Sequence, residues 1–156
     1  MKDESRTVQT LQASIDECPF NAFSGFQIES WNDEEQVLTL TMPLRAEFER
    51  LPGSGQIHGG PIASLIDTAG CYALMAVTGS IVATITFRTD YLRPAKNTAL
   101  RAVATVRKAG RSVGVVDVDV VNECEKLVAI GRGTYSSTSS LSVRQGSVEQ
   151  KEKVMR

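Results

Sequence analysis

The sequence predicts one compact, soluble α+β domain in which a long central helix is wrapped by a strongly curved, mostly antiparallel sheet of about six strands. Its 156 residues suit a single domain. One run, PIASLIDTAGCYALMAVT at 61–78, is apolar nearly all round, and a helix without a polar face must be covered on most sides. The segments on either side alternate apolar and polar residues, as strands do. A curved sheet around the helix accounts for all of these observations.

The composition argues against several classes of protein. Lys and Arg number 17 and Asp and Glu 18, so the net charge of -1 provides no field that would attract nucleic acid. The opening MKDESRTVQT lacks the apolar run of a signal peptide. Polar residues interrupt the one apolar stretch that approaches membrane-spanning length. We therefore expect a cytoplasmic protein without a nucleic-acid or membrane partner.

The cysteines and the single histidine argue against a metal site. Cys18, Cys71 and Cys124 are widely separated and form no C-x-x-C pair, so they favour neither a disulfide framework nor zinc. His58 is the only histidine, and no H-x-x-x-H spacing exists. The expectation is a domain without metal, whose thiols are reduced and mostly buried.

A short helix and a hairpin are predicted first. Apolar residues recur at helical spacing over 6–17. Two segments of alternating apolar residues follow at 23–31 and 36–42, separated by the polar turn Asn32-Asp33-Glu34-Glu35. Prolines and glycines then interrupt the segment 43–60, which we expect to be an irregular loop leading to the central helix.

The central helix and the remaining strands complete the domain. Pro61 suits the first turn of the helix, and Gly79 follows its last residue. The period of the pattern then changes to two, so the residues from Ile81 onward predict a strand. Three further strands are expected, as an antiparallel meander, at 100–107, 113–122 and 127–135. The predicted organisation is an N-terminal extension, a folded domain and a frayed tail, at 1–20, 21–136 and 137–156.

Asp67 is the only charged residue between Gly60 and Gly79, in a segment expected to be buried. Burying a carboxylate costs free energy unless it is hydrogen-bonded, reaches water or is needed for function. One interpretation places Asp67 on a wet edge of the helix, bonded to a backbone group. The other makes it a general base or nucleophile whose pKa is raised by its apolar surroundings.

The segment His58-Gly59-Gly60 lies where the central helix begins. Unpaired backbone N–H groups and the positive end of the helix dipole are available there, and glycine lets a ligand approach closely. These features outline an oxyanion site, and they also fit a tight turn with a packed histidine. Gly59 and Asp67 are about 12 Å apart along a helix, so both act on one reacting group only if a second subunit supplies one of them. The sequence thus predicts a homodimer at least.

Basic residues at a predicted turn offer contacts to phosphate. Lys108 and Arg111 flank Gly110 between two expected strands, and charged donors of this kind bind phosphate oxygens strongly. The other interpretation is that both are ordinary surface charges.

The run His58-Gly59-Gly60-Pro61-Ile62-Ala63-Ser64-Leu65-Ile66-Asp67, followed by the apolar helix and a strand ending Tyr91-Leu92-Arg93-Pro94-Ala95, resembles the hot-dog-fold thioesterases of the phenylacetic-acid-degradation type. The resemblance extends from Phe23 to Tyr135. It implies a helix wrapped by an antiparallel sheet and dimers that pair into homotetramers. It also implies hydrolysis of acyl-coenzyme A without a cofactor, since coenzyme A is part of the substrate.

The resemblance also implies roles for single residues. The Gly59 N–H would polarise the thioester carbonyl, while Asp67 of the neighbouring subunit would activate water or attack directly. Thr84, on the strand that leads to Pro94, would hold the attacking water. His58 would orient the loop beside the thioester rather than transfer a proton.

One position departs from the pattern of the family. Several relatives carry an Asn before the histidine where this chain has Pro52, and Gln56 or Ser54 would have to replace its amide. The departure affects the fine geometry of the loop and the substrate preference, while Asp67 and the helix start are intact.

The acyl group is expected between subunits, close to Gly60 and against Leu65, Ile66 and Tyr72 of the central helix. Aryl, short-chain and medium-chain groups all stay open, as does the packing of dimers into tetramers. One alternative is a sensor or carrier that binds acyl-coenzyme A without cleaving it. Another is a hydratase or dehydratase of the same fold, which pairs a histidine with an acid in a different motif.

Overall fold

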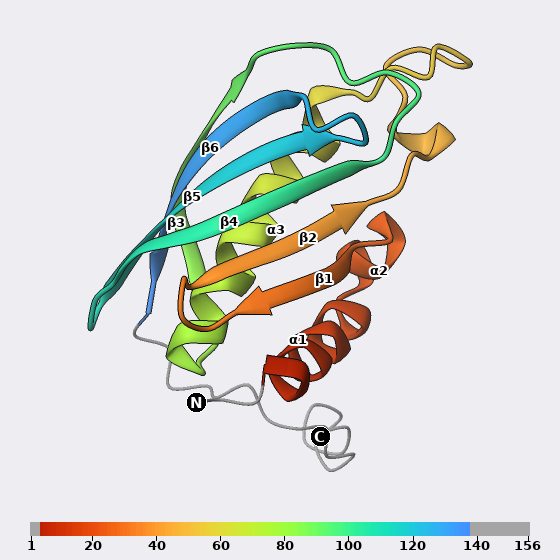
Figure 1. Ribbon diagram of the computed structural model, residues 1–156. Helices are drawn as coiled ribbons and strands as arrows, with labels where there is room; N and C mark the ends of the chain where they lie inside the picture. Colours follow the sequence, from red (N-terminus) through yellow and green to blue (C-terminus); the bar gives the residue numbers. More distant parts are fainter. Residues whose placement is uncertain (1–3, 138–156) are drawn as a thin grey trace, which may run out of the picture.

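A six-stranded antiparallel sheet curves around helix α3, with its strands in the order β1-β2-β4-β5-β6-β3 (Figure 1). The computed structural model describes residues 4–137. The sheet stays open, with β1 at one edge and β3 at the other. The elements are α1 Glu4–Glu17, α2 Pro19–Ser24, β1 Gln27–Asn32, β2 Val37–Met42, the 3-10 turn η1 Ala46–Phe48, α3 Gly59–Thr78, β3 Ala83–Tyr91, β4 Leu100–Ala109, β5 Val113–Asn122 and β6 Leu127–Ser136.

Helix α3 is the core of the domain, and its ends are fixed by local chemistry. His58 is the N-cap, and its Nδ1 accepts a hydrogen bond from the Gly60 N–H at 3.0 Å. Gly79 ends the helix in the left-handed conformation at φ 67°, which its lack of a side chain permits. The helix begins at Gly59 rather than at the expected Pro61, because the His58 cap extends it by one half-turn.

Among the described residues, α3 is also the one helix long and apolar enough to cross a membrane by length and composition. More than half of its most apolar window, 56%, is buried within the domain. The same length and composition mark the core helix of a globular domain, and the sheet provides the cover that the sequence required.

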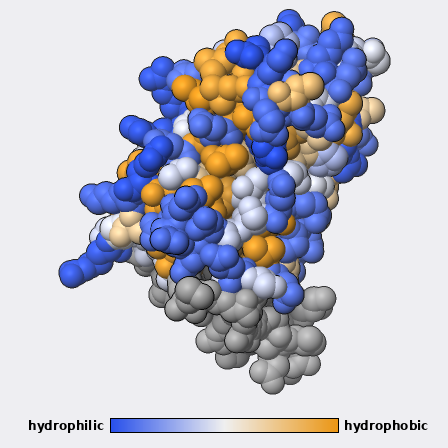
Figure 2. Space-filling model, in the orientation of Figure 1, coloured by the Kyte–Doolittle hydropathy of each residue, from blue (hydrophilic) through white to orange (hydrophobic). Residues whose placement is uncertain are grey.

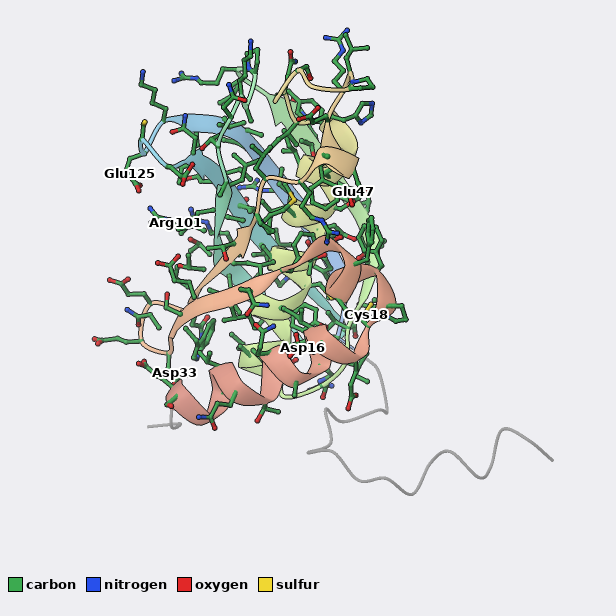
Figure 3. The ribbon with its side chains drawn as sticks, turned by 90° about the vertical axis from the view of Figure 1, so that its right-hand side faces the viewer. Asp16, Cys18, Asp33, Glu47, Arg101 and Glu125 are labelled. Atoms are coloured by element: carbon green, nitrogen blue, oxygen red, sulfur yellow. The ribbon has the colours of Figure 1, made fainter. Side chains whose placement is uncertain are left out.

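The first predicted strand was wrong in its N-terminal half. Residues 19–24 form α2, because Pro19 occupies the first helical position and Gly25 ends the helix with a left-handed cap at φ 69°. The strand β1 therefore begins at Gln27 instead of Phe23. Figure 3 views the molecule from the side that carries α1 and α2, with Cys18 labelled at the junction between them.

The two edges of the sheet differ in how they are covered. Helix α1 lies along β1 (Figure 1), and Gln12 of that helix accepts a hydrogen bond from the Ile28 N–H at 2.7 Å. Within residues 4–137, strand β3 has a neighbouring strand, β6, on one side only. It also exposes large apolar side chains, with Ile85 57% and Phe87 38% accessible. An open edge of this kind is a template for pairing with another strand.

Three further expectations need correction. The loop 43–60 contains the short turn η1. The strand from Ile81 begins only at Ala83, and a register shift between Thr84 and Thr86 breaks its simple alternation. The cysteines are less buried than expected, and Cys124 is exposed because it lies in the turn between β5 and β6. The predicted frayed tail falls largely on 138–156, which lies outside the described residues.

The outer face of the sheet is charged. It faces the viewer in Figure 2, where hydrophilic residues cover most of it with apolar ones among them. Asp117 pairs with both Arg107 and Arg132 across three strands, and this holds the pKa of Asp117 below its usual range. These residues line a shallow cleft of about 360 Å³ on the side of the sheet away from α3.

Candidate active site

Asp67 lies in the N-terminal half of α3, and its side chain points to the start of β3. Thr84 Oγ1 donates a hydrogen bond to Asp67 Oδ1 at 2.9 Å. Asp67 is half-buried, while Thr84 is exposed. The two residues singled out for catalysis at these positions are therefore in direct contact. The sequence also allowed the carboxylate to bond to a backbone group. The structure differs, because the partner of Asp67 is the side-chain hydroxyl of Thr84.

Burial controls the electrostatics of Asp67. Loss of water around the carboxylate raises its pKa, and the hydrogen bond from Thr84 opposes that rise. None of the ion pairs among the described residues involves Asp67. Cys71 lies one turn further along the same helix, where burial and the nearby Asp67 charge raise the pKa of its thiol to about 12. Among the described residues, Asp67 is thus a carboxylate with no cationic partner to lower its pKa, and a raised pKa suits a general base.

The start of α3 leaves one backbone donor available. His58 is exposed, and its ring nitrogen Nδ1 already accepts the hydrogen bond from the Gly60 N–H. The Gly59 N–H has no acceptor within the helix, because the helix begins there. Tyr91 Oη donates to the Gly59 carbonyl at 2.8 Å, and a Cβ on Gly59 would come within 3.1 Å of the Tyr91 ring. Of the two glycines, Gly59 therefore offers the free N–H.

The chain does not bring Gly59 and Asp67 together. Both lie on the unbroken helix α3, and their positions differ by about 12 Å at the usual helical rise. The backbone donor and the carboxylate of one chain are thus too far apart to act on the same small reacting group.

The predicted phosphate contacts lie at the end of the sheet where β3 begins. Lys108 and Arg111 are exposed, and the Gly110 N–H closes the turn on the Val113 carbonyl at 3.0 Å. A Cβ on Gly110 would come within 2.6 Å of that carbonyl oxygen, so the turn needs glycine. Thr84 pairs with Tyr135, which in turn pairs with the Gly114 that follows this turn. Two strand spacings, roughly 10 Å, separate Thr84 from Gly114.

The residues expected around the acyl group are buried in this chain. Leu65 and Ile66 are both 0% exposed and belong to the core. Tyr72 directs its hydroxyl to Ser14 Oγ at 3.3 Å, so it faces the N-terminal helices. Gln56 is half-buried beside the helix start, and its backbone pairs with that of Lys96. Their part in substrate binding stays a prediction.

Two tyrosines contact this site without having been predicted. Tyr91 holds the Gly59 carbonyl, and Tyr135 Oη donates to the Asp67 backbone oxygen at 3.3 Å. For Tyr135 the sequence carried one signal, Gly133 on the same strand, where a Cβ would come within 2.2 Å of the Tyr135 hydroxyl. Glycines inside a strand often mark the close approach of another group.

Known proteins resemble this chain over most of its length. The family model for the thioesterase superfamily matches residues 54–145. The acyl-coenzyme A thioesterase PaaI of Escherichia coli is 36% identical over 110 residues, covering 70% of this chain and 75% of the relative. The medium/long-chain acyl-CoA thioesterase YigI of the same organism is 27% identical over 132 residues, covering 75% and 84%.

A solved structure gives the same result for the fold. The structure of E. coli PaaI superposes with a TM-score of 0.77 at 30% identity, covering 88% of this chain and 97% of the other. Because this superposition covers 88% of the chain, the likeness extends beyond residues 54–145, which the family model matches. The chain belongs to the thioesterase superfamily and has its hot-dog fold.

Proposed function

We propose that this protein hydrolyses an acyl-coenzyme A thioester to the free acid and coenzyme A. The observation that carries the proposal is the pair formed by Asp67 and Thr84, a carboxylate with a raised pKa held by a hydroxyl at an open strand edge. The names of the E. coli relatives, an acyl-coenzyme A thioesterase and a medium/long-chain acyl-CoA thioesterase, support it.

The proposed reaction needs only a base, a donor and water. Asp67 takes a proton from water while the water oxygen bonds to the thioester carbonyl carbon. The Gly59 N–H stabilises the negative charge that forms on the carbonyl oxygen. The C–S bond then breaks, and coenzyme A leaves as the thiol with the proton that Asp67 took from the water. Direct attack by Asp67, which forms an acyl anhydride that water opens, uses the same groups.

We propose that each site combines Gly59 of one subunit with Asp67 of another. Within one chain the two lie about 12 Å apart along a helix. The open β3 edge supports this arrangement, because pairing of two β3 strands would bury Ile85 and Phe87 and extend the sheet across a two-fold axis. The assembly is then a homodimer, with a homotetramer as the larger form implied by the resemblance to the family.

The substrate side of the proposal uses residues at both ends of the site. The acyl group, an aryl or a short- or medium-chain one, lies near Gly60 and Gln56, and contact with Leu65, Ile66 and Tyr72, which are buried in this chain, would require the helix face to open. The phosphates of coenzyme A contact Lys108, Gly110 and Arg111. No cofactor enters the proposed reaction.

Thiol release from a panel of aryl, short-chain and medium-chain acyl-coenzyme A esters tests the proposal. Release with at least one of them, together with the free acid, supports it. Binding of these esters without release would instead favour a sensor or carrier. Hydration of an enoyl ester without release of thiol would favour a hydratase.

Replacing both Lys108 and Arg111 by alanine is expected to raise KM for acyl-coenzyme A about tenfold, since charge-assisted bonds to phosphate are lost. The KM for the matching N-acetylcysteamine thioester, which has no phosphate, is expected to stay unchanged. Steady-state kinetics with both substrates measure the difference. Lys126→Ala, at the turn between β5 and β6, is the matched control. An equal rise in KM for both substrates would contradict the phosphate role.

Replacing Thr84 by valine is expected to move the acidic limb of the pH–rate profile to higher pH. The Thr84 hydrogen bond lowers the pKa of Asp67 and opposes the effect of burial, so its removal raises that pKa further. Hydrolysis requires ionised Asp67, so activity appears only at higher pH. The measurement is kcat/KM against pH for both proteins. An acidic limb that moves to lower pH, or does not move, would contradict the effect of Thr84 on the pKa of Asp67.

A further inference from the structure

Tyr135 is a buried tyrosine whose hydroxyl lies next to the backbone of Asp67. Its side chain is 0% exposed, and its Oη donates to the Asp67 carbonyl oxygen at 3.3 Å. Placing a hydroxyl in an apolar core costs free energy unless it is hydrogen-bonded. Phenylalanine would fill the same space without that cost. A hydroxyl kept in this place therefore suggests a role beyond packing.

Two glycines make room for this hydroxyl. Gly70 lies on α3 and Gly133 on β6. A Cβ on Gly70 would come within 2.1 Å of Tyr135 Oη, and a Cβ on Gly133 within 2.2 Å. Both distances are far below a van der Waals contact. The position of the hydroxyl thus depends on glycine in two elements that are distant in the sequence.

The sheet holds Asp67 at two points through neighbouring residues. Thr84 on β3 is directly opposite Tyr135 on β6 in the strand register. Thr84 donates to the Asp67 side chain at 2.9 Å, and Tyr135 to the Asp67 backbone at 3.3 Å. Together the two hydroxyls fix both the side chain and the backbone of one residue relative to the sheet. Catalytic groups need placement to within about 0.5 Å.

We propose that Tyr135 is a positioning residue for catalysis, which holds α3 on the sheet so that the Asp67 carboxylate meets Thr84 and the substrate correctly. This inference rests on the proposed role of Asp67. Tyr135 contacts no substrate and transfers no proton; it acts through the backbone of the helix.

Tyr135→Phe tests the inference. We expect kcat to fall roughly tenfold, because a misplacement of about 1 Å can cost about a hundredfold and the loss of one hydrogen bond should shift the helix by less. KM should stay within about twofold, since no substrate contact is removed. The variant should fold, because the Asp67 carbonyl keeps its intrahelical acceptor role toward the Cys71 N–H. Thr78→Val is the matched control, as it removes a hydroxyl bonded to the Leu74 carbonyl of the same helix; its kcat should equal that of the wild type.

A double-mutant cycle with Thr84→Val distinguishes positioning from a purely structural role. If both hydroxyls place the same carboxylate, the combined loss in kcat is smaller than the product of the single losses. A combined loss equal to the product of the single losses would overturn the inference. A lower melting temperature with an unchanged kcat per folded subunit would also overturn it. Loss of activity in Asp67→Asn with full activity in Tyr135→Phe would overturn this inference alone. Full activity in Asp67→Asn would overturn the proposed mechanism and this inference together.

Discussion

Replacing Asp67 by asparagine is expected to lower kcat by at least about a thousandfold. The amide has the same shape and can still accept the Thr84 hydrogen bond, but it neither takes a proton from water nor forms an acyl intermediate. The free energy of unfolding, by contrast, should not fall at neutral pH. Burial raises the Asp67 pKa in the folded state, so the stability associated with this group is present at low pH and is lost as the pH rises through that pKa. At neutral pH the uncharged amide should fold at least as stably.

Thiol release and thermal unfolding at neutral pH measure both effects on one sample. Asp119→Asn is the control for the change of charge, because Asp119 is exposed on β5 away from α3. Its activity and melting temperature should match those of the wild type. Hydrolysis by Asp67→Asn at the wild-type rate would remove Asp67 from the mechanism.

Replacing Gly59 by proline is expected to lower kcat by about a hundredfold or more, the usual effect of losing one oxyanion donor. Proline removes the N–H and suits the first position of a helix. The preceding His58 has φ −66° and ψ 151°, an extended conformation that a following proline favours. Gly59→Ala keeps the N–H and places its Cβ at 3.1 Å from the Tyr91 ring, so it controls for crowding. Equal activity in the two variants would contradict the backbone role.

Mixing the two inactive subunits tests whether one site needs two chains. In a dimer of one Asp67→Asn chain and one Gly59→Pro chain, one site receives both defects and the other receives none. Co-expression with different affinity tags and isolation of the mixed dimer should therefore restore about half of the wild-type activity, as the two-fold arrangement requires. A mixed dimer as inactive as its parents would place both residues in one chain's site.

The central helix and the meander were predictable because their patterns are local. Gly79 and the apolar run define the end of α3, and β5 has the predicted bounds 113–122. The fold class followed, since an all-round apolar helix leaves few ways to cover it. The helix α2 was missed because its buried residues, Asn21 and Ser24, are polar, while its Phe20 and Phe23 are half-exposed, at 52% and 50%, so no apolar helical face marks it in the sequence.

The site was predictable only where the family pattern or a single charge marked a residue. Asp67 stood out as the lone charge in an apolar run, and Thr84 was reached through its place on the strand to Pro94. Tyr135 lies 68 residues from Asp67, so only the pairing of β3 with β6 brings its hydroxyl to the helix. Long-range contacts of this kind have no periodicity, and Gly133 marks a close approach in the sequence without showing that it involves Asp67.

The protonation of Cys71 determines whether its sulfur can accept an acyl group from a thioester. A thiolate exchanges readily with thioesters, whereas a thiol hardly does. Because burial and the Asp67 charge raise its pKa to about 12, Cys71 is almost entirely protonated at neutral pH. We therefore expect this sulfur, one helical turn from the carboxylate, to stay inert toward the acyl group that the proposed reaction transfers to water.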